Sequence, residues 1–173
     1  MVDFLKMDEV LSHLDLKEDM IAAEFGCGGA MFTISLSKIL SKGRVYALDI
    51  QEAKLSALKG KTKQQKINNI FTVLCDLEAK NGSTLQDNSL DIVLMPNLLF
   101  QAEDKNAIVE EAKRVLKTGG QLLIIDWLRE NSFGPQKIIK PDEVKKIASS
   151  LGLSFKKEFV SGDYHYALLF TKH

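Results

Sequence analysis

Few cysteines, no long apolar run and no excess of either charge limit what this sequence can be. Cys27 and Cys75 are too few for a disulfide framework and are typical of a reducing compartment. No apolar run approaches the ~20 residues needed to cross a bilayer. The segment from Met1 to Asp8 mixes acidic and apolar residues, without the basic and apolar regions of a signal peptide. These features predict a cytoplasmic protein that does not enter a membrane.

The charges of the chain balance. It has 23 Lys and Arg residues against 23 Asp and Glu residues, and a pI of about 6.8. A dedicated nucleic-acid binder usually carries a basic excess, so the balance argues against such a partner, although RNA held in a local patch stays open. The lysines at positions 54, 59, 61, 63 and 66 are interpreted as the solvated face of an outer helix. No His, Cys and Asp residues share the spacing of metal ligands, so no metal is expected.

Short apolar runs alternate with longer segments of helical period along the chain. The runs are rich in Ile, Val and Leu without clean alternation, which is typical of strands buried on both faces of a parallel sheet. The expected strands are Met20–Phe25, Arg44–Ile50, Ile70–Asp76, Leu90–Met95 and Gln121–Trp127. Helices are expected between them, over Met31–Lys42, over Glu103–Lys117 and from Pro141 to Gly152. This order predicts a doubly wound α/β fold, and the 173 residues suit one domain.

The end of the chain departs from this alternation. Leu153–Val160 alternates, with Leu153, Phe155 and Phe159 expected on one face, and a short turn separates it from a strand over Tyr164–Thr171. Strands joined by so short a turn must be antiparallel, because a parallel crossover needs a dozen or more residues. The sequence therefore predicts a terminal antiparallel hairpin on a mostly parallel sheet.

A glycine-rich loop follows the first expected strand and opens a helix. It contains Gly26, Gly28 and Gly29 between Glu24 and Ala30. Glycine lets the backbone turn tightly and approach a ligand closely. The N-terminus of the following helix favours an anionic group. The loop therefore predicts a nucleotide-type cofactor site.

Two patterns compete for this loop. The dinucleotide fingerprint Gly-x-Gly-x-x-Gly, started at Gly26, needs a small residue at position 31 but finds Met31. The methyltransferase pattern acid-x-Gly-x-Gly-x-Gly finds Glu24, Gly26 and Gly28, and then Ala30 in place of the last glycine. The loop therefore favours the methyltransferase pattern.

With these motifs, the sequence resembles the class I S-adenosylmethionine-dependent methyltransferases, in the branch similar to the ubiquinone and menaquinone biosynthesis methyltransferases. The resemblance runs from about Met20 to the C-terminus and also rests on three further segments: Val45–Ile50, Leu90–Met95 and the helix-to-strand segment Glu111–Gly120. It implies a Rossmann-like seven-stranded sheet of order 3-2-1-4-5-7-6. It also implies S-adenosyl-L-methionine as the cofactor and transfer of its methyl group as the activity.

The resemblance implies roles for individual residues. Asp49, at the end of the second strand, would accept hydrogen bonds from the ribose hydroxyls, and Ile50 would pack on the adenine ring. The backbone of Gly26 and Gly28 would bracket the methionyl part, which Glu24 would orient. The set of cofactor-binding residues is completed by Asp76 and Leu77 at the adenine edge, by Met95 at the end of the fourth strand, and by Cys27, interpreted as a small filler and not as a nucleophile.

The acceptor is expected beside the cofactor at the carboxyl edge of the sheet. Asn97 and Asp126, after the fourth and fifth strands, are candidate acceptor contacts, and His165 is a candidate general base. A small molecule is the first expectation for the acceptor, while protein or RNA stays open. The segment 1–19, with a short amphipathic helix over Asp3–Leu14, is a candidate lid, as is the loop Leu128–Lys140.

Two other classes of function stay open. The chain could bind the cofactor without catalysing transfer, or it could be a nicotinamide-dependent oxidoreductase, against which Met31 and the terminal hairpin argue. The sequence is compatible with a monomer or a homodimer.

Overall fold

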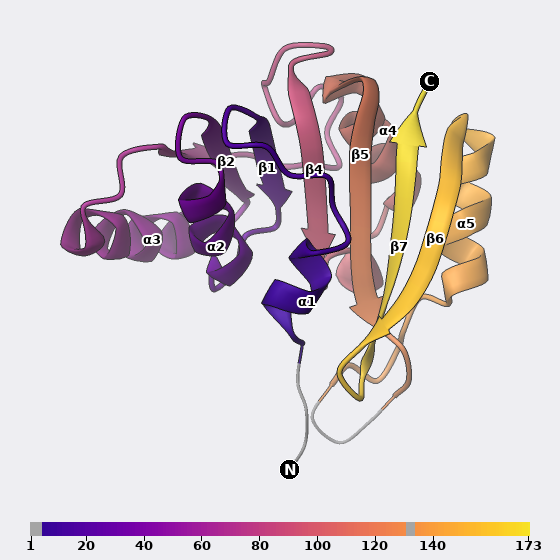
Figure 1. Ribbon diagram of the computed structural model, residues 1–173. Coiled ribbons are helices and arrows are strands. Elements are labelled where there is room, and N and C mark those ends of the chain that lie inside the picture. The colour runs from indigo at the N-terminus through magenta and orange to yellow at the C-terminus, as the bar shows by residue number, and fades with distance from the viewer. Residues whose placement is uncertain (1–4, 131–133) are drawn as a thin grey trace.

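The computed structural model describes residues 5–130 and 134–173, and its centre is a seven-stranded sheet (Figure 1). The order of the strands is β3-β2-β1-β4-β5-β7-β6. In chain order the strands are β1 (Ile21–Phe25), β2 (Arg44–Asp49), β3 (Ile70–Leu74), β4 (Leu90–Pro96), β5 (Leu116–Trp127), β6 (Leu153–Ser161) and β7 (His165–Lys172). Strands β1 to β5 are parallel to one another, and β7 pairs antiparallel with both β5 and β6. The predicted strand order and terminal hairpin are confirmed.

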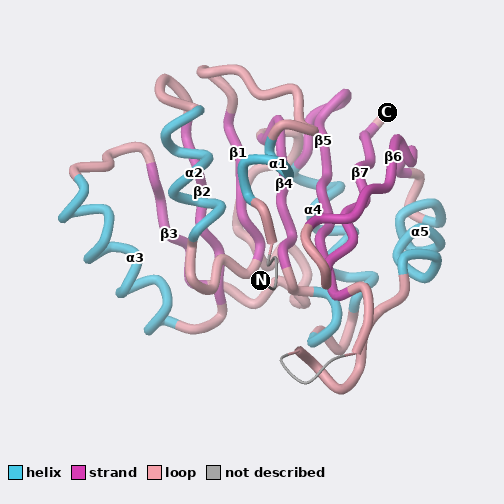
Figure 2. The backbone as a smooth tube through the Cα atoms, turned by 60° about the horizontal axis from the view of Figure 1, so that its bottom comes forward, coloured by secondary structure: helices cyan, strands magenta, loops and turns pink. Residues whose placement is uncertain are grey.

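Helices cover both faces of this sheet. They are α1 (Met7–Leu11), α2 (Met31–Ile39), α3 (Glu52–Gln65), α4 (Lys105–Val115) and α5 (Pro141–Ser150), with a short 3-10 helix, η1 (Leu99–Gln101). Apolar residues of α1 and α2 pack on one face of the sheet, and those of α4 and α5 pack on the other. Both views place α1 next to β4 (Figure 1, Figure 2). The arrangement is the doubly wound one that alternating strands and helices predict.

The central strands are apolar because they are buried on both faces. Ala22 and Ala23 are adjacent in β1 and both fully buried, yet they belong to the cores on opposite faces of the sheet. The same holds for Val93 and Leu94 in β4. Successive side chains of a strand point to opposite faces, so a strand between two helical layers needs apolar residues at every position. No described helix has the length and apolar character to span a bilayer.

The predicted common face of Phe155 and Phe159 is wrong. The pairing of β6 with β7 shifts between Phe155 and Lys157, so that Lys156 is an extra residue in β6. Such a bulge reverses the alternation of the residues after it. Phe155 therefore contacts Phe170 on the face that carries α5, whereas Phe159 packs on the face that carries α1.

Three predicted helices are longer than those observed. Helix α2 ends at Ile39 and not at Lys42. Helix α4 ends at Val115, because Leu116 is already extended and pairs with Leu90 of β4. The predicted N-terminal helix shrinks to α1, and residues 3 and 4 of the predicted range lie outside the described residues. In the other predicted lid loop, Phe133 also lies outside them.

The residue that ends helix α3 allows a test of its backbone conformation. Lys66 caps this helix with a φ of 56°, a left-handed conformation that costs most L-residues roughly 1–2 kcal/mol. Because Lys66 is exposed, we expect Lys66→Gly to raise the free energy of unfolding by about 0.5–1 kcal/mol. The matched control is Lys63→Gly inside the same helix, which should lower it by about 1 kcal/mol. Urea denaturation measures both, and a loss of stability in Lys66→Gly would contradict the assigned cap.

Candidate active site

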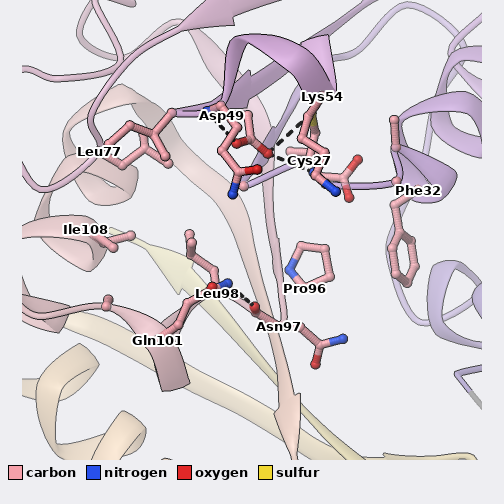
Figure 3. Close-up of a pocket in the computed structure, with 18 of the residues that line it drawn as sticks. Cys27, Phe32, Asp49, Lys54, Leu77, Pro96, Asn97, Leu98, Gln101 and Ile108 are labelled. Atoms are coloured by element: carbon pink, nitrogen blue, oxygen red, sulfur yellow. Dashed lines mark hydrogen bonds between the residues drawn. The ribbon is translucent and has the colours of Figure 1, made fainter. Parts of the chain in front are cut away.

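A cavity of about 770 Å³ opens at the carboxyl ends of the parallel strands. The loops after β1, β2, β3 and β4 line it, together with Trp127 at the end of β5, His165 at the start of β7, and Leu5 and Met7 of the N-terminal segment (Figure 3). The sheet order reverses between β1 and β4, and this is where doubly wound folds bind ligands. A volume of this size is within the range of roughly 300–1,000 Å³ typical of small-molecule pockets.

The glycine loop has the backbone conformation that its sequence predicts. Gly26 and Gly28 have φ angles of 71° and 47°, in the left-handed region. A Cβ atom on Gly26 would lie 2.9 Å from Leu98 Cδ1, whereas one on Gly29 would meet nothing within 4 Å. Ala30 also has a positive φ, of 58°, and so takes the conformation of the glycine that it replaces. The positive φ angles at Gly26, Gly28 and Ala30 set the backbone conformation of this loop, and the loop lines the cavity.

Glu24 connects the end of β1 to the first turn of α2. Its carboxylate accepts hydrogen bonds from the backbone N–H and the hydroxyl of Thr33, the third residue of α2. The Glu24 carboxyl group therefore satisfies one backbone N–H in the first turn of this helix. Glu24 is only 2% exposed, and burial raises its pKa to about 8, against the opposing effect of the Thr33 bonds. Glu24 also lines the cavity, so it is a carboxyl group that can exchange its proton near neutral pH.

Asp49 ties the end of β2 to the glycine loop. Its Oδ2 atom accepts the Gly28 N–H at 2.9 Å, and its Oδ1 atom accepts the Gln51 N–H at 2.9 Å. The Cys27 thiol lies 3.9 Å from Oδ2, as Figure 3 shows. The carboxylate is nearly buried and lines the cavity, so it can both hold the loop and accept bonds from a ligand.

The residues expected at the adenine also line the cavity. Ile50 is 65% exposed, although it is a large apolar residue. Asp76 is exposed and accepts the Glu78 N–H at 2.9 Å, while Leu77 is buried beside it. An exposed isoleucine next to a concave wall offers an apolar surface for a flat ring.

The two cysteines lie in the cavity wall as thiols. Burial raises the pKa of Cys27 to about 12 and that of Cys75 to about 11, and nearby carboxylates add to both shifts. A thiolate is the reactive form of cysteine, so these groups are inert at neutral pH. The interpretation of Cys27 as a filler agrees with this environment.

Asn97 and His165 lie in the cavity wall, at the end away from Asp49. Asn97 follows β4 with a φ of 53°, and its carbonyl accepts a bond from the Gln101 side chain. In Figure 3 its side chain lies on the other side of Pro96 from Asp49. His165 is 2% exposed, and burial lowers its pKa, so the imidazole is neutral at pH 7.

Two of the predicted site residues, Asp126 and Met95, are not part of the cavity wall. Asp126 is fully buried and accepts bonds from the N–H groups of Phe100 and Trp127, and burial raises its pKa to about 6. Successive residues of β5 face opposite sides, so Trp127 lines the cavity and Asp126 instead holds η1 in place. Met95 is fully buried in the core.

The sequence analysis missed several residues in and near the wall. Thr33 does not line the cavity but is the partner of Glu24, and a hydroxyl residue in the first turn of a helix was a usable signal. Leu98 precedes η1, Gln101 ends it and Lys54 lies in the first turn of α3, where nothing in the local pattern marks them as wall residues. In the described part of the chain, no group of three or more His, Cys, Asp or Glu residues could hold a metal ion.

Comparisons with known proteins agree with this geometry. The family model of the methyltransferase domain matches residues 16–162. A demethylmenaquinone methyltransferase of Staphylococcus haemolyticus is 36% identical over 118 residues, which is 68% of this chain and 47% of that protein. One of Bacillus subtilis is 28% identical over 132 residues, which is 73% of this chain and 54% of that protein. The chain thus spans about half the length of the curated relatives that it matches.

Among solved structures, a SAM-dependent methyltransferase from Aquifex aeolicus has a TM-score of 0.88 and 26% identity. The match covers 98% of this chain and 90% of that one. Fold and site together define a Rossmann-like methyltransferase of class I. The chain belongs to the methyltransferase domain family, in the S-adenosylmethionine-dependent branch that includes the demethylmenaquinone methyltransferases.

Proposed function

We propose that this chain transfers the methyl group of S-adenosylmethionine to a small-molecule acceptor. The observation that carries the proposal is the placement of Glu24. Because the Glu24 carboxyl group accepts the Thr33 N–H, that donor in the first turn of α2 is not left for the pyrophosphate of a dinucleotide. The cavity wall carries the acidic residues Glu24, Asp49, Asp76 and Glu78 against one lysine, Lys54, which suits a cationic cofactor.

The proposed cofactor contacts follow the cavity wall from β1 to β3. Asp49 accepts the ribose hydroxyls, and Ile50 packs on the adenine, whose edge meets Asp76 and the backbone of Leu77. The open backbone from Gly26 to Gly28, with Cys27 as a small filler, borders the methionyl part near Glu24. The support for these roles is that all of these residues line one cavity.

Bound S-adenosylmethionine supplies a methyl group on a positively charged sulfur. The task of the chain is then to hold an acceptor atom in line with that methyl group and to exclude water. Asn97 and His165 are the proposed acceptor-side residues, and His165 is the candidate general base because its imidazole is neutral. The N-terminal segment is the proposed lid, since Leu5 and Met7 line the cavity.

A small molecule is the proposed acceptor because the relatives above are named for demethylmenaquinone, and because the cavity has the size of a small-molecule pocket. We further propose a cytoplasmic location, which the two free cysteines support. A monomer or a homodimer is proposed as the working form.

Calorimetric titration tests the proposed cofactor. We expect S-adenosylmethionine and S-adenosylhomocysteine to bind with micromolar affinity and NADH not to bind. Binding of NADH alone would favour the oxidoreductase class. If both sulfur compounds bind but no small-molecule acceptor is methylated, the chain is a cofactor-binding module or acts on a macromolecule.

A further inference from the structure

Three side chains at one end of the cavity carry buried polar atoms without a hydrogen-bond partner. They are Asn97 Oδ1, Trp127 Nε1 and both ring nitrogens of His165. In the described part of the chain, the only other side-chain atom in this state is Thr171 Oγ1, and Thr171 does not line the cavity. Unpaired buried polar atoms are therefore concentrated at this one place.

The three side chains come from neighbouring strand ends. Trp127 of β5 and His165 of β7 are paired in the sheet, and their ring centroids lie 4.5 Å apart. Asn97 follows β4, the other neighbour of β5, and its backbone N–H donates to Ile125. Strands β4, β5 and β7 thus bring one amide, one indole and one imidazole to the same edge of the sheet.

The adjacent pair on the opposite face of the same strands is fully bonded. Asp126 accepts two backbone N–H groups, and the Tyr166 hydroxyl donates to the Ile139 carbonyl at 2.9 Å. Asp126 and Tyr166 are paired in the sheet just as Trp127 and His165 are. At these paired positions of β5 and β7, the polar groups on the core side are therefore bonded, and those of Trp127 and His165 on the cavity side are not.

Leaving these atoms unpaired is costly, because each buried group without a partner costs about 1–3 kcal/mol. Apolar residues of similar shape would avoid that cost, so a ligand that pairs with these atoms is the natural explanation. The atoms are shielded from solvent, and hydrogen bonds made in such surroundings are stronger than exposed ones.

The available atoms define the charge of that ligand. An indole N–H donates, an amide oxygen accepts, and a neutral imidazole does one of each. The charged residues of the cavity wall, which are Glu24, Asp49, Lys54, Asp76 and Glu78, all belong to β1, β2, α3 and the loop after β3. The unpaired atoms belong to β5, β7 and the turn after β4, so none of these charged wall residues lies on an element that carries them. A charged group bound there would lack a counterion on those wall positions, whereas an uncharged group needs none.

We propose that Asn97, Trp127 and His165 form the acceptor subsite, and that it takes an uncharged molecule whose polar group both donates and accepts hydrogen bonds, such as a hydroxyl or an amide. This inference rests on the proposed function, because it assigns the second half of the same cavity.

The single tryptophan of the chain is the reporter for the test. Trp127 fluorescence is followed while the chain, saturated with S-adenosylhomocysteine, is titrated with three probes of one shape: cyclohexanecarboxamide, cyclohexanecarboxylate and protonated cyclohexylmethylamine. We expect a saturable change with the carboxamide and at least tenfold weaker binding of the two charged probes. Equal or tighter binding of either charged probe, or no saturable change with the carboxamide, would overturn the proposal.

Two variants test whether the carboxamide binds at the proposed subsite. Asn97→Gly removes the amide and still tolerates the positive φ, and His165→Leu removes the imidazole at similar volume. Each should weaken carboxamide binding about three- to tenfold. Thr171→Val, which removes the unpaired hydroxyl outside the cavity, is the matched control and should leave binding unchanged. Unchanged binding in both Asn97→Gly and His165→Leu, with a retained fold, would also overturn the subsite.

Binding of S-adenosylhomocysteine, measured first by calorimetry, separates the two proposals. If it binds and the carboxamide does not, the subsite is wrong and the proposed cofactor stands. If it does not bind, the proposed function fails, and the same three probes titrated into the free chain still decide whether the subsite exists.

Discussion

The affinity of the chain for S-adenosylmethionine should rise nearly tenfold from pH 6 to pH 7, about fivefold from pH 7 to pH 8, and level off above about pH 9. The reason is Glu24, whose pKa burial raises to about 8. Below that pH the free chain holds this carboxyl group protonated. A cationic cofactor favours the ionised form, so binding must release the proton, and the release costs more free energy at lower pH. Above about pH 9 the free chain has already lost most of this proton, and the effect ends.

Calorimetry at several pH values measures this dependence, and repeating the titrations in buffers of different ionisation enthalpy counts the protons released. We expect close to one proton per cofactor at pH 7 for the wild type. Glu24→Gln cannot ionise and keeps an oxygen that can accept from Thr33, so it is the matched control. Ionisation of the cofactor itself affects the wild type and Glu24→Gln equally, so the ratio of their two affinities at each pH isolates the contribution of Glu24. A ratio that is constant from pH 6 to pH 8 would mean that Glu24 does not respond to the cofactor.

Asp49→Ala should weaken cofactor binding by at least about 1.5–3 kcal/mol, or roughly tenfold to a hundredfold. The carboxylate has two tasks in the proposed complex. It accepts the ribose hydroxyls, and it already holds the N–H groups of Gly28 and Gln51. Its removal therefore loses direct contacts and also loosens the loop that borders the methionyl part.

Glu52→Ala is the control for Asp49→Ala, because Glu52 is an exposed acid three residues away that does not line the cavity. Its affinity should equal that of the wild type. Thermal unfolding without the cofactor shows whether each variant is folded. A folded Asp49→Ala protein with wild-type affinity would remove Asp49 from the cofactor site.

Most residues proposed for the cofactor could be placed at one cavity from sequence because local spacing and strand ends position them, although Met95 lies in the core instead. Glu24, Gly26 and Gly28 lie within five consecutive residues, and strand ends place Asp49 and Asp76 at the same edge of the sheet. The left-handed φ angles at the two glycines follow from the same local pattern. Features that depend on residues close together in the chain can be predicted from a single sequence.

The acceptor half could not be predicted in the same way. The alternation in β5 shows that Asp126 and Trp127 point in opposite directions, but not which of them faces the cavity. Which of the two faces the cavity depends on how η1 and the loop after β4 pack. The Phe100 N–H of η1 donates to the Asp126 carboxylate and so keeps Asp126 on the core side. The bulge at Lys156 could not be predicted either. Phe159 and Val160 follow it on opposite faces of β6, so an apolar residue falls on each face with or without the bulge.

The sheet order has a consequence for the synthesis of the chain. The cofactor wall is complete once residues up to about Glu78 have been made, except for the turn after β4. In contrast, β5 remains an edge strand until β7, residues 165–172, has been made and can pair with it. A nascent chain of intermediate length therefore leaves Gln121–Trp127 of β5, a mostly apolar edge, open to pairing with another chain until the final hairpin is made.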